Sequence, residues 1–239
     1  MEAKKSLGQN FFVNENLGKY IIDRIKQGNV DTVVEIGPGL GFFTEKLIQR
    51  FKNVVVIEKD SILAKDLSNK YPQITIKNED FLDMKLDDIS SNKLIYFGSL
   101  PYNVSKPILK KIITSKTFTN GAYFIVQKEV AEKYMYKEPY NILSLTTHIY
   151  ADVKKEFDIS PDSFRPKPKV TSSFISLSSR MQPDIDIQKL EKLIKESFKY
   201  PRKNLRNNLK KTEYIDKITE FEDKRPAELS LEEYISILQ

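Results

Sequence analysis

Four consecutive residues near the middle of the chain could hold a nucleobase amine for chemistry. They are Ser99, Leu100, Pro101 and Tyr102, and they follow the predicted strand 93–97. The proline stiffens the turn and favours an extended Leu100, so that carbonyl oxygens point outward and can accept hydrogen bonds from an NH2 group. The ring of Tyr102 offers a stacking face for a base taken out of its helix. We therefore predict that these residues form a catalytic turn.

A glycine-rich turn follows the predicted strand 32–36. Gly37, Gly39 and Gly41 have the spacing G-x-G-x-G and lead into a predicted helix. Glycine lets the backbone turn tightly and approach a ligand, which makes Gly37 and Gly39 candidate cofactor-binding residues. The spacing differs from the G-x-G-x-x-G of dinucleotide enzymes, and Glu35 before the turn suits a nucleoside-binding methyltransferase better than a pyrophosphate site. A purely structural turn is the alternative.

Acidic residues end the next two predicted strands. Glu58 closes the strand 54–58, where a carboxylate can accept hydrogen bonds from both hydroxyls of a ribose, and Asp80 follows the strand 74–77, where it can accept from an adenine amine. Taken singly, each could be an exposed acid at a strand end. Open α/β sheets bind ligands along the carboxyl ends of their strands, so we predict that both acids share one edge with the glycine turn and Ser99.

The order of the elements predicts the fold class. Short apolar, β-branched runs alternate with amphipathic segments, which indicates an α/β protein with a mostly parallel sheet covered by helices on both faces. A break at residues 182–184 separates a domain 1–181 from a small basic helical domain 182–239. The predicted strands are 32–36, 54–58, 74–77, 93–97, 122–127, 153–159 and 172–177. Helices are predicted at 15–26, 42–50, 61–70, 106–115, 128–134, 187–198, 201–209, 213–217 and from residue 231.

Composition narrows the possible functions. The chain has 239 residues, of which 40% are hydrophobic and 30% charged, as is ordinary for a globular protein. No apolar run approaches the roughly 20 residues needed to span a membrane. With no cysteine and one histidine, disulfides, thiol catalysis, and cysteine or histidine metal clusters are excluded. We expect a cytoplasmic monomer with neither a membrane partner nor a metal.

Two segments carry the residue types that bind nucleic acid. The net charge is +6, and basic residues dominate 189–211, where Arg202, Lys203 and Arg206 are candidates for contacts with RNA phosphates. A solvated helix face is the alternative there. In the proline-spaced loop 163–170, Phe164 could stack on a base. Lys167 and Lys169 could meet phosphate, or the segment could be an ordinary loop.

These motifs together resemble the KsgA-type small-subunit ribosomal RNA adenine dimethyltransferases. The resemblance covers the chain nearly from end to end, in matching order and spacing. Its C-terminal pieces are closer to this family than to the related antibiotic-resistance methyltransferases of 23S RNA. The matching segments are SLGQNFF, VVEIGPGLGFFTEKL, VVVIEKD, NEDFLD, FGSLPYNVSKPIL, FIVQKEVAEKY, SFRPKPKVTSSFI, FKYPRKNLRNNL and RPAELSLEEY.

The resemblance implies a class I methyltransferase fold, a seven-stranded sheet and S-adenosylmethionine as methyl donor. It implies dimethylation of N6 on two adjacent adenosines in the 3′-terminal hairpin of small-subunit rRNA, on an immature 30S-type particle, with a role in small-subunit assembly. Tyr102 and Phe164 match the aromatic residues around the target adenine. The residues that match the cofactor pocket of the family are Asn10, Phe12, Gly37, Glu58, Asp80 and Ser99.

One position departs from the family pattern. The first residue of the catalytic turn is usually asparagine or aspartate, and here it is Ser99, whose short side chain removes one expected acceptor for the target amine. A second hypothesis is therefore an rRNA-binding assembly factor with weakened catalysis. A third is a nicotinamide-dependent oxidoreductase, against which both the glycine spacing and the Ser-Leu-Pro-Tyr turn argue.

Overall fold

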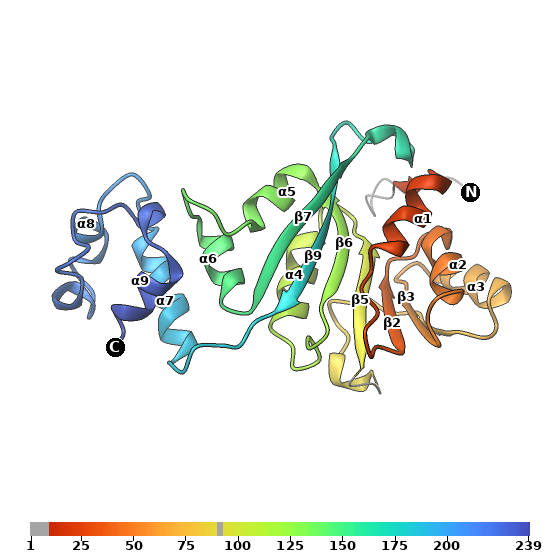
Figure 1. Ribbon diagram of the computed structural model, residues 1–239, viewed down its shortest axis with the longest axis horizontal. Helices are drawn as coiled ribbons and strands as arrows, with labels where there is room; N and C mark the ends of the chain where they lie inside the picture. Colours follow the sequence, from red (N-terminus) through yellow and green to blue (C-terminus); the bar gives the residue numbers. More distant parts are fainter. Residues whose placement is uncertain (1–9, 90–92) are drawn as a thin grey trace. The chain divides into compact units, whose positions relative to one another are not determined.

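A computed structural model describes residues 10–89 and 93–239, which divide into two compact units. The first unit contains the described residues up to 132 together with 154–179, and the second contains 133–153 and 180–239. Figure 1 shows the first unit built around a sheet and the second built from helices. Each unit has its own cluster of buried apolar side chains.

The first unit is built on a seven-stranded sheet of described residues, in the order β4-β3-β2-β5-β6-β9-β7. Neighbouring strands from β4 to β6 pair in parallel, and β9 pairs antiparallel with β6. The mostly parallel sheet predicted from the sequence is therefore confirmed. The strands are β2 (Thr32–Ile36), β3 (Asn53–Ile57), β4 (Thr75–Lys77), β5 (Leu94–Ser99), β6 (Ala122–Gln127), β7 (Ala151–Ile159) and β9 (Ser172–Ser179).

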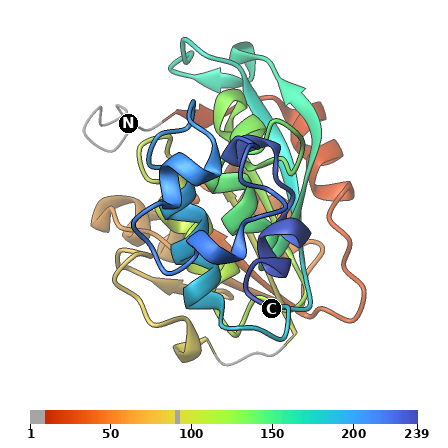
Figure 2. The ribbon, with the colours of Figure 1, turned by 90° about the vertical axis from the view of Figure 1, so that its left-hand side faces the viewer.

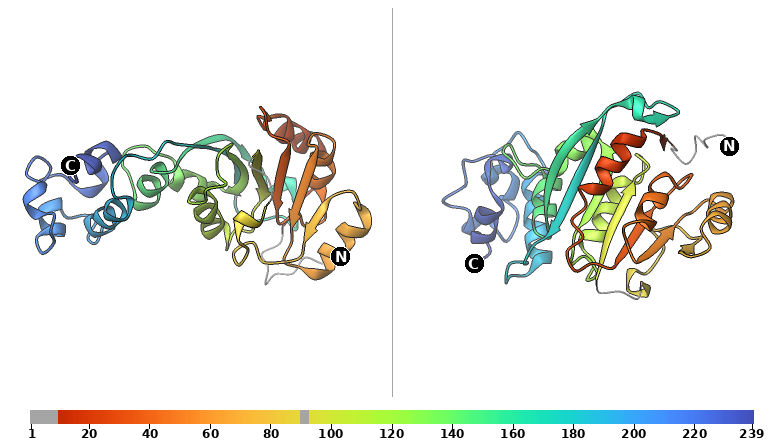
Figure 3. Two further views of the ribbon diagram at one scale, coloured as in Figure 1. Left: turned by 90° about the horizontal axis from the view of Figure 1, so that it is seen from below. Right: turned by 45° about the vertical axis from the view of Figure 1, so that its right-hand side comes forward.

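Helices cover both faces of this sheet because its central strands are apolar on both sides. Every residue of β2 is buried, as expected for a strand in the middle of a parallel sheet. In the right-hand view of Figure 3, α1 lies across the near face, whereas α4 lies behind the strands in Figure 1. The helices of this unit are α1 (Glu15–Asp23), α2 (Phe42–Ile48), α3 (Ser61–Lys70), η2 (Leu86–Asp88), α4 (Ser105–Ile113) and η3 (Pro161–Ser163).

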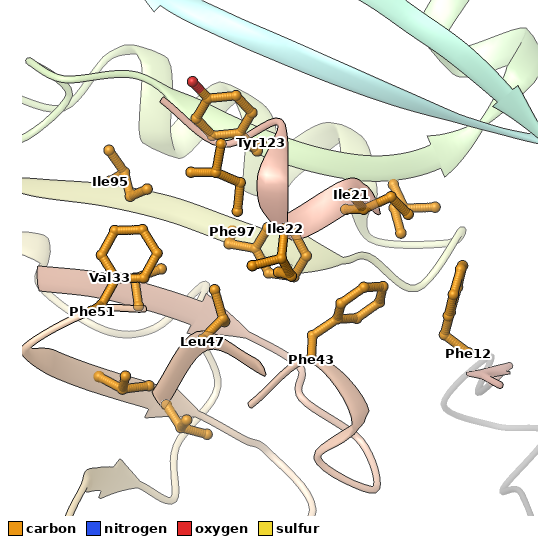
Figure 4. Packing of buried hydrophobic residues seen from close by; sticks show 14 of the residues in the cluster. Phe12, Ile21, Ile22, Val33, Phe43, Leu47, Phe51, Ile95, Phe97 and Tyr123 are labelled. Carbon is orange, nitrogen blue, oxygen red and sulfur yellow. The ribbon is translucent and has the colours of Figure 1, made fainter. Parts of the chain in front are cut away.

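The core on the α1 face is rich in aromatic rings. Figure 4 shows Phe43 and Leu47 of α2 pointing toward Ile22 of α1 and toward Phe97 of β5. The ring centroids of Phe43 and Phe97 are 5.0 Å apart, and those of Phe12 and Phe43 are 4.8 Å apart. Residue 12 is thereby anchored in the core close to the start of the described chain.

A two-stranded sheet that the sequence did not predict joins distant parts of this unit. β1 (Phe11–Phe12) pairs antiparallel with β8 (Phe164–Arg165), so that Phe12 lies opposite Phe164. The two rings meet edge to face with centroids 5.1 Å apart. Two-residue strands give no alternation pattern that could be recognised in a sequence.

The second unit is a helical bundle around Leu190, Leu193 and Leu205. Figure 2 shows its later helices in blue. Its elements are α6 (Ile142–His148), α7 (Ile187–Ser197), α8 (Leu205–Leu209), η4 (Ile215–Lys217), η5 (Pro226–Glu228) and α9 (Leu231–Ser236), and α5 (Lys128–Tyr134) crosses the division between the units. In the described part of the chain, no helix is long and apolar enough to cross a membrane.

This division differs from the domain boundary expected at residue 181. Residues 133–153 belong with the helical unit because Leu145 and Ile149, at most 1% exposed, pack in its core. The backbone N–H of Tyr140 also donates to the carbonyl of Ala227 at 2.8 Å. Helix α6 was not predicted, since seven residues give barely two turns of apolar periodicity.

A buried hydrogen bond ties the end of β2 to α2 across the glycine turn. The Thr44 hydroxyl donates to Oε2 of Glu35 at 2.6 Å, and the two residues are at most 2% exposed. Burial raises the pKa of Glu35 to about 8, because the dry interior disfavours the charged form; the Thr44 bond opposes this rise and the charge of Glu58 adds to it. Glu35 therefore carries a proton at neutral pH.

The raised pKa of Glu35 makes the stability of this unit pH-dependent. Between pH 4.5 and about 8 the folded chain keeps a proton that the unfolded chain has released, so the free energy of unfolding falls as pH rises through this window. At about 1.4 kcal/mol per pH unit, we expect the wild type to lose about 2–3 kcal/mol more than Glu35→Gln between pH 5.5 and 7.5. Urea unfolding at the two pH values measures this difference.

A matched control is Glu45→Gln, which changes an exposed acid on α2, directly after Thr44. It should leave the pH dependence as it is in the wild type, because that side chain lies in solvent in both states. Equal pH dependence in Glu35→Gln and the wild type would show that Glu35 is already ionised in the folded protein.

Candidate active site at the carboxyl edge of the sheet

A cavity of about 240 Å³ lies where β2, β3 and β5 end. Parallel strands place their carboxyl ends at one edge, which is where open α/β sheets bind ligands. Of the residues predicted from the sequence, those that line the cavity are Asn10, Gly37, Gly39, Glu58, Asp80, Ser99, Leu100, Pro101, Tyr102 and Phe164. Residues from six predicted segments therefore meet at one place.

The glycine turn brings backbone close to the cavity. Gly37 and Gly39 have φ values of 64° and 58°, a left-handed conformation that favours glycine. A Cβ atom on Gly39 would lie 2.9 Å from the ring of Phe11, so a side chain there would displace the wall of the cavity. The backbone N–H of Gly39 donates to Oε2 of Glu58 at 3.4 Å. This hydrogen bond thus fixes the position of the glycine turn relative to Glu58, which follows β3.

Glu58 presents a fixed carboxylate to the cavity. Its Oε1 accepts from the backbone N–H of Asp60 at 2.8 Å, and the side chain is 7% exposed. Burial raises the pKa of Glu58, while the N–H groups of Asp60 and Gly39 oppose this rise because they favour the charged form. Each oxygen keeps lone-pair directions for a ligand, and two neighbouring hydroxyls match that geometry.

Asp80, which also lines the cavity, is held by two contacts. Its Oδ2 pairs with Nζ of Lys59 at 2.7 Å, and its Oδ1 accepts from the backbone N–H of Leu82 at 2.8 Å. The hydrogen bond from Lys59 is the main reason why the pKa of Asp80 is lowered, with a further contribution from the Leu82 N–H. Asp80 is therefore an ionised acceptor at neutral pH.

The catalytic turn leaves its acceptors free. The backbone N–H of Leu100 donates to the carbonyl of Ile125 at 3.0 Å, which fixes the residue at the end of β5. Within the described chain, no group donates to the Leu100 carbonyl oxygen, and the Ser99 hydroxyl has no hydrogen-bond partner. The Tyr102 hydroxyl is tied to Ser172 Oγ at 2.8 Å, and burial raises its pKa. The ring is thus fixed at the cavity wall.

The cavity is lined by Phe11 and not by its neighbour Phe12. Phe12 was predicted to bind the cofactor, but Phe11 lines the cavity and Phe12 packs in the core, 5% exposed. Successive side chains of a strand point to opposite faces, so only one of the two rings can face the cavity. Asn103 also lines the cavity and was not predicted; its place directly after Tyr102 in the turn was the available signal.

The proline-spaced segment 163–170 contributes one wall residue and no lysine to the cavity. Phe164 lines the cavity but is 1% exposed, so it acts as packed wall more than as an open stacking face. Lys167 and Lys169 are exposed and are not among the cavity-lining residues, and Lys167 pairs with Asp162 at 2.5 Å. Their predicted contacts with phosphate stay a prediction.

The basic segment of the second unit is exposed and rigidly built. Arg202, Lys203 and Arg206 all lie in solvent, and Arg206 is 3.5 Å from the carboxylate of Glu222. The side chain of Asn208, 8% exposed, holds the preceding loop. Its Oδ1 accepts from the N–H of residue 200, and its Nδ2 donates to the carbonyls of residues 200, 203 and 204 at 3.1 Å each.

The groups that line the cavity resemble those of a nucleoside site. Among the described residues, no group of three or more histidine, cysteine, aspartate or glutamate side chains could hold a metal ion. The groups that face the cavity are instead hydrogen-bond acceptors, backbone and aromatic rings, which suit hydroxyls, amines and planar bases.

Comparison with known proteins identifies the family. A family model described as ribosomal RNA adenine dimethylase matches residues 1–239. The ribosomal RNA small subunit methyltransferase A of Francisella tularensis subsp. tularensis is 36% identical and covers 99% of this chain and 96% of its own length. The protein of the same name from Chlorobium phaeobacteroides (strain DSM 266) is 33% identical and covers 99% of this chain and 90% of its own length.

Solved structures show the same fold. The 23S rRNA methyltransferase ErmE has a TM-score of 0.78 at 22% identity and covers 96% of this chain and 98% of its own. A dimethyladenosine transferase from Plasmodium falciparum has a TM-score of 0.81 at 21% identity, with 95% of both chains covered. The predicted class I methyltransferase fold is thereby confirmed. From the family match over its whole length, this chain belongs to the ribosomal RNA adenine dimethylase family.

Proposed function

We propose that this protein transfers methyl groups from S-adenosylmethionine to N6 of two adjacent adenosines in the 3′-terminal hairpin of small-subunit rRNA. The observation that carries the proposal is the single cavity lined by the glycine turn, Glu58, Asp80 and the catalytic turn from Ser99 to Tyr102. The relatives named ribosomal RNA small subunit methyltransferase A support the substrate class. We place the reaction on an immature 30S-type particle during assembly, carried out by a cytoplasmic monomer.

The residues present fit the cofactor. Gly39 has no side chain that would displace Phe11 from the cavity wall, and Glu58 offers acceptors to the ribose hydroxyls while Asp80 offers one to the adenine amine. Asn10 lines the same cavity. S-adenosylmethionine supplies a methyl group already activated by its sulfonium charge, so the chain need provide neither a nucleophile nor a metal.

The chain's task is then to hold and orient the target amine. The lone pair of an adenine N6 is delocalised into its ring, and acceptors on the two N6 hydrogens favour a pyramidal nitrogen with its lone pair free to attack. The unpaired carbonyl of Leu100 can accept one of these hydrogens. Tyr102, fixed by Ser172, supplies a stacking face beside it. Alignment and electrostatic stabilisation of this kind account for the catalysis.

Two alternative functions were considered from the sequence, an oxidoreductase and an assembly factor with weakened catalysis. The oxidoreductase hypothesis is wrong, because the family match covers the whole chain. The hypothesis of an assembly factor with weakened catalysis depends on Ser99 alone. Its hydroxyl has no partner within the described chain and so can point into the cavity, which means that serine can still contact the amine directly or through a water.

We place the RNA phosphates on the basic segment of Arg202, Lys203 and Arg206, and also near Lys167 and Lys169. The exposure of these side chains supports the proposal, since a phosphate contact needs a cation that is open to solvent. Such contacts set affinity and orientation, whereas the chemistry belongs to the cavity.

The proposed function is tested by methyl transfer. Purified protein with labelled S-adenosylmethionine should label small subunits that lack the modification and should not label mature, modified subunits. Glu58→Ala, which removes the acceptors for the ribose, should weaken cofactor binding by about 1–3 kcal/mol in calorimetry. Failure of the wild type to label unmodified subunits, with S-adenosylmethionine bound, would reject the proposed activity.

The catalytic turn predicts opposite effects for two substitutions. Ser99→Asn restores a longer acceptor that acts mainly in the transition state, so the single-turnover rate should rise by about tenfold or more with cofactor and RNA affinity unchanged. Tyr102→Ala should slow the reaction and also weaken capture of the flipped adenine by about 1–3 kcal/mol, since the stacking face is lost. A rate for Ser99→Asn no higher than the wild type would mean that serine already does the work, which removes the support for weakened catalysis.

The basic segment predicts a change in salt dependence. Replacing Arg202, Lys203 and Arg206 together by glutamine should weaken RNA binding and flatten its salt dependence by about 0.7–0.9 log units of slope per lost phosphate contact. Binding of S-adenosylmethionine should be unaffected. Titrations of RNA at several salt concentrations measure both the affinity and the slope.

The control removes the same charge from elsewhere. The three exposed lysines Lys52, Lys65 and Lys116, replaced together by glutamine, should change the slope much less. If the salt dependence of RNA binding had the same slope in the two triple variants, the basic segment would be a solvated helix face and not an RNA contact.

A further inference from the structure

Lys111 of α4 reaches across to the loop that carries Asp80. Its Nζ donates to the carbonyl of Leu82 at 2.6 Å and to that of Met84 at 2.5 Å. Both hydrogen bonds are partly buried, and they join residues 27 and 29 positions apart in the sequence. The contact therefore links the helix that follows the catalytic turn with the loop that follows β4.

The loop 80–84 forms a single helical turn, at whose ends backbone groups have no partner within the turn. The turn begins at Asp80, whose carbonyl oxygen accepts from the backbone N–H groups of Asp83 at 3.0 Å and Met84 at 3.2 Å. The side chain of Asp80 accepts from the backbone N–H of Leu82. The carbonyls at the far end of such a turn lack partners within the turn. In the described part of the chain, Lys111 supplies the donor for two of them. A cation is the donor that this end of a helical turn prefers.

Charge and packing reinforce this link. The Nζ of Lys111 lies 5.6 Å from the ring centroid of Phe81, which is 4% exposed. Its positive charge is one of the causes that lower the pKa of Asp80, after the closer Lys59. Lys59 contacts the Asp80 side chain directly, whereas Lys111 contacts only the backbone that carries it. The two lysines thus hold different parts of the same loop.

We propose that Lys111 is a positioning residue for the cofactor: it fixes the loop 80–84 to α4, so that Asp80 and Leu82 keep their places at the cavity wall. The inference rests on the proposed use of S-adenosylmethionine. Because Lys111 is not among the residues that line the cavity, it acts through the loop and not by contact with the ligand. The same lysine connects the part of the cavity for the cofactor's adenine with the helix that starts three residues after Tyr102.

The experiment compares three variants by calorimetry with S-adenosylmethionine in the absence of RNA. Lys111→Met, which keeps the apolar stem and removes the donors, should raise the dissociation constant by about fivefold or more. Lys111→Arg, which keeps charge and donors, should stay within about threefold of the wild type. Lys110→Met is the matched control, because it removes one exposed charge from the same helix, and it should change nothing measurable.

Steady-state kinetics separates positioning from a merely structural role. For Lys111→Met the KM for S-adenosylmethionine should rise, while kcat at saturating cofactor stays near the wild-type value, since the target amine is held elsewhere. A lowered melting temperature with an unchanged dissociation constant would overturn the inference. An equal loss of affinity in Lys111→Arg and Lys111→Met would also overturn it. If the methionine variant folds poorly, a loss greater than about threefold in Lys111→Arg, which keeps the charge and the donors, would overturn the inference by itself.

The outcomes also distinguish this inference from the proposed function. If the wild type binds no S-adenosylmethionine, the proposed function fails and the role of Lys111 fails with it. If the wild type binds the cofactor and methylates small subunits but Lys111→Met binds it equally well, only the role of Lys111 is rejected.

Discussion

Parallel pairing in register between β2 and its two neighbours is the constraint on which the site depends. Ile36 lies opposite Ile57, and Glu35 opposite Phe97, so the three strands end together. The hydrogen-bond ladder continues past the strand ends: the N–H of Gly37 donates to Ile57 and that of Glu58 to Lys77. A shift of one residue in either pairing would turn every side chain of the shifted strand to the other face. The ligand-facing groups and the core are therefore specified by the same pairing.

Two carboxyl groups close to the glycine turn have different surroundings. Glu35 is buried in the core, where the Thr44 hydroxyl donates a hydrogen bond to it, and its pKa of about 8 leaves it neutral. Glu58 accepts from two backbone N–H groups, which favour its charged form. The neutral acid ties β2 to α2, whereas Glu58 lines the cavity. The nearby Glu58 adds to the burial that raises the pKa of Glu35.

The parts of the site that were predictable lie at strand ends, where residue type and position coincide. The glycine turn, Glu58, Asp80 and the catalytic turn follow apolar runs long enough to be recognised, and the structure brings them together. What could not be predicted depends on pairing between distant, very short segments. Pairing with β8, which lies about 150 residues away, decides which of Phe11 and Phe12 faces the cavity. Helix α6 is assigned to the helical unit only by contacts such as that of Leu145. Lys111 likewise gives no signal in a helix where other lysines face solvent.

Under the proposed contact of RNA with the basic segment, Asn208 affects how quickly that contact can form. One buried amide satisfies the backbone of residues 200, 203 and 204, so the loop bearing Arg202 and Lys203 keeps its shape before any partner arrives. When a partner binds these cations, their backbone loses little conformational entropy, and only the ends of the side chains have to become ordered. Encounters steered by charge can therefore lead to a bound complex without waiting for the loop to order.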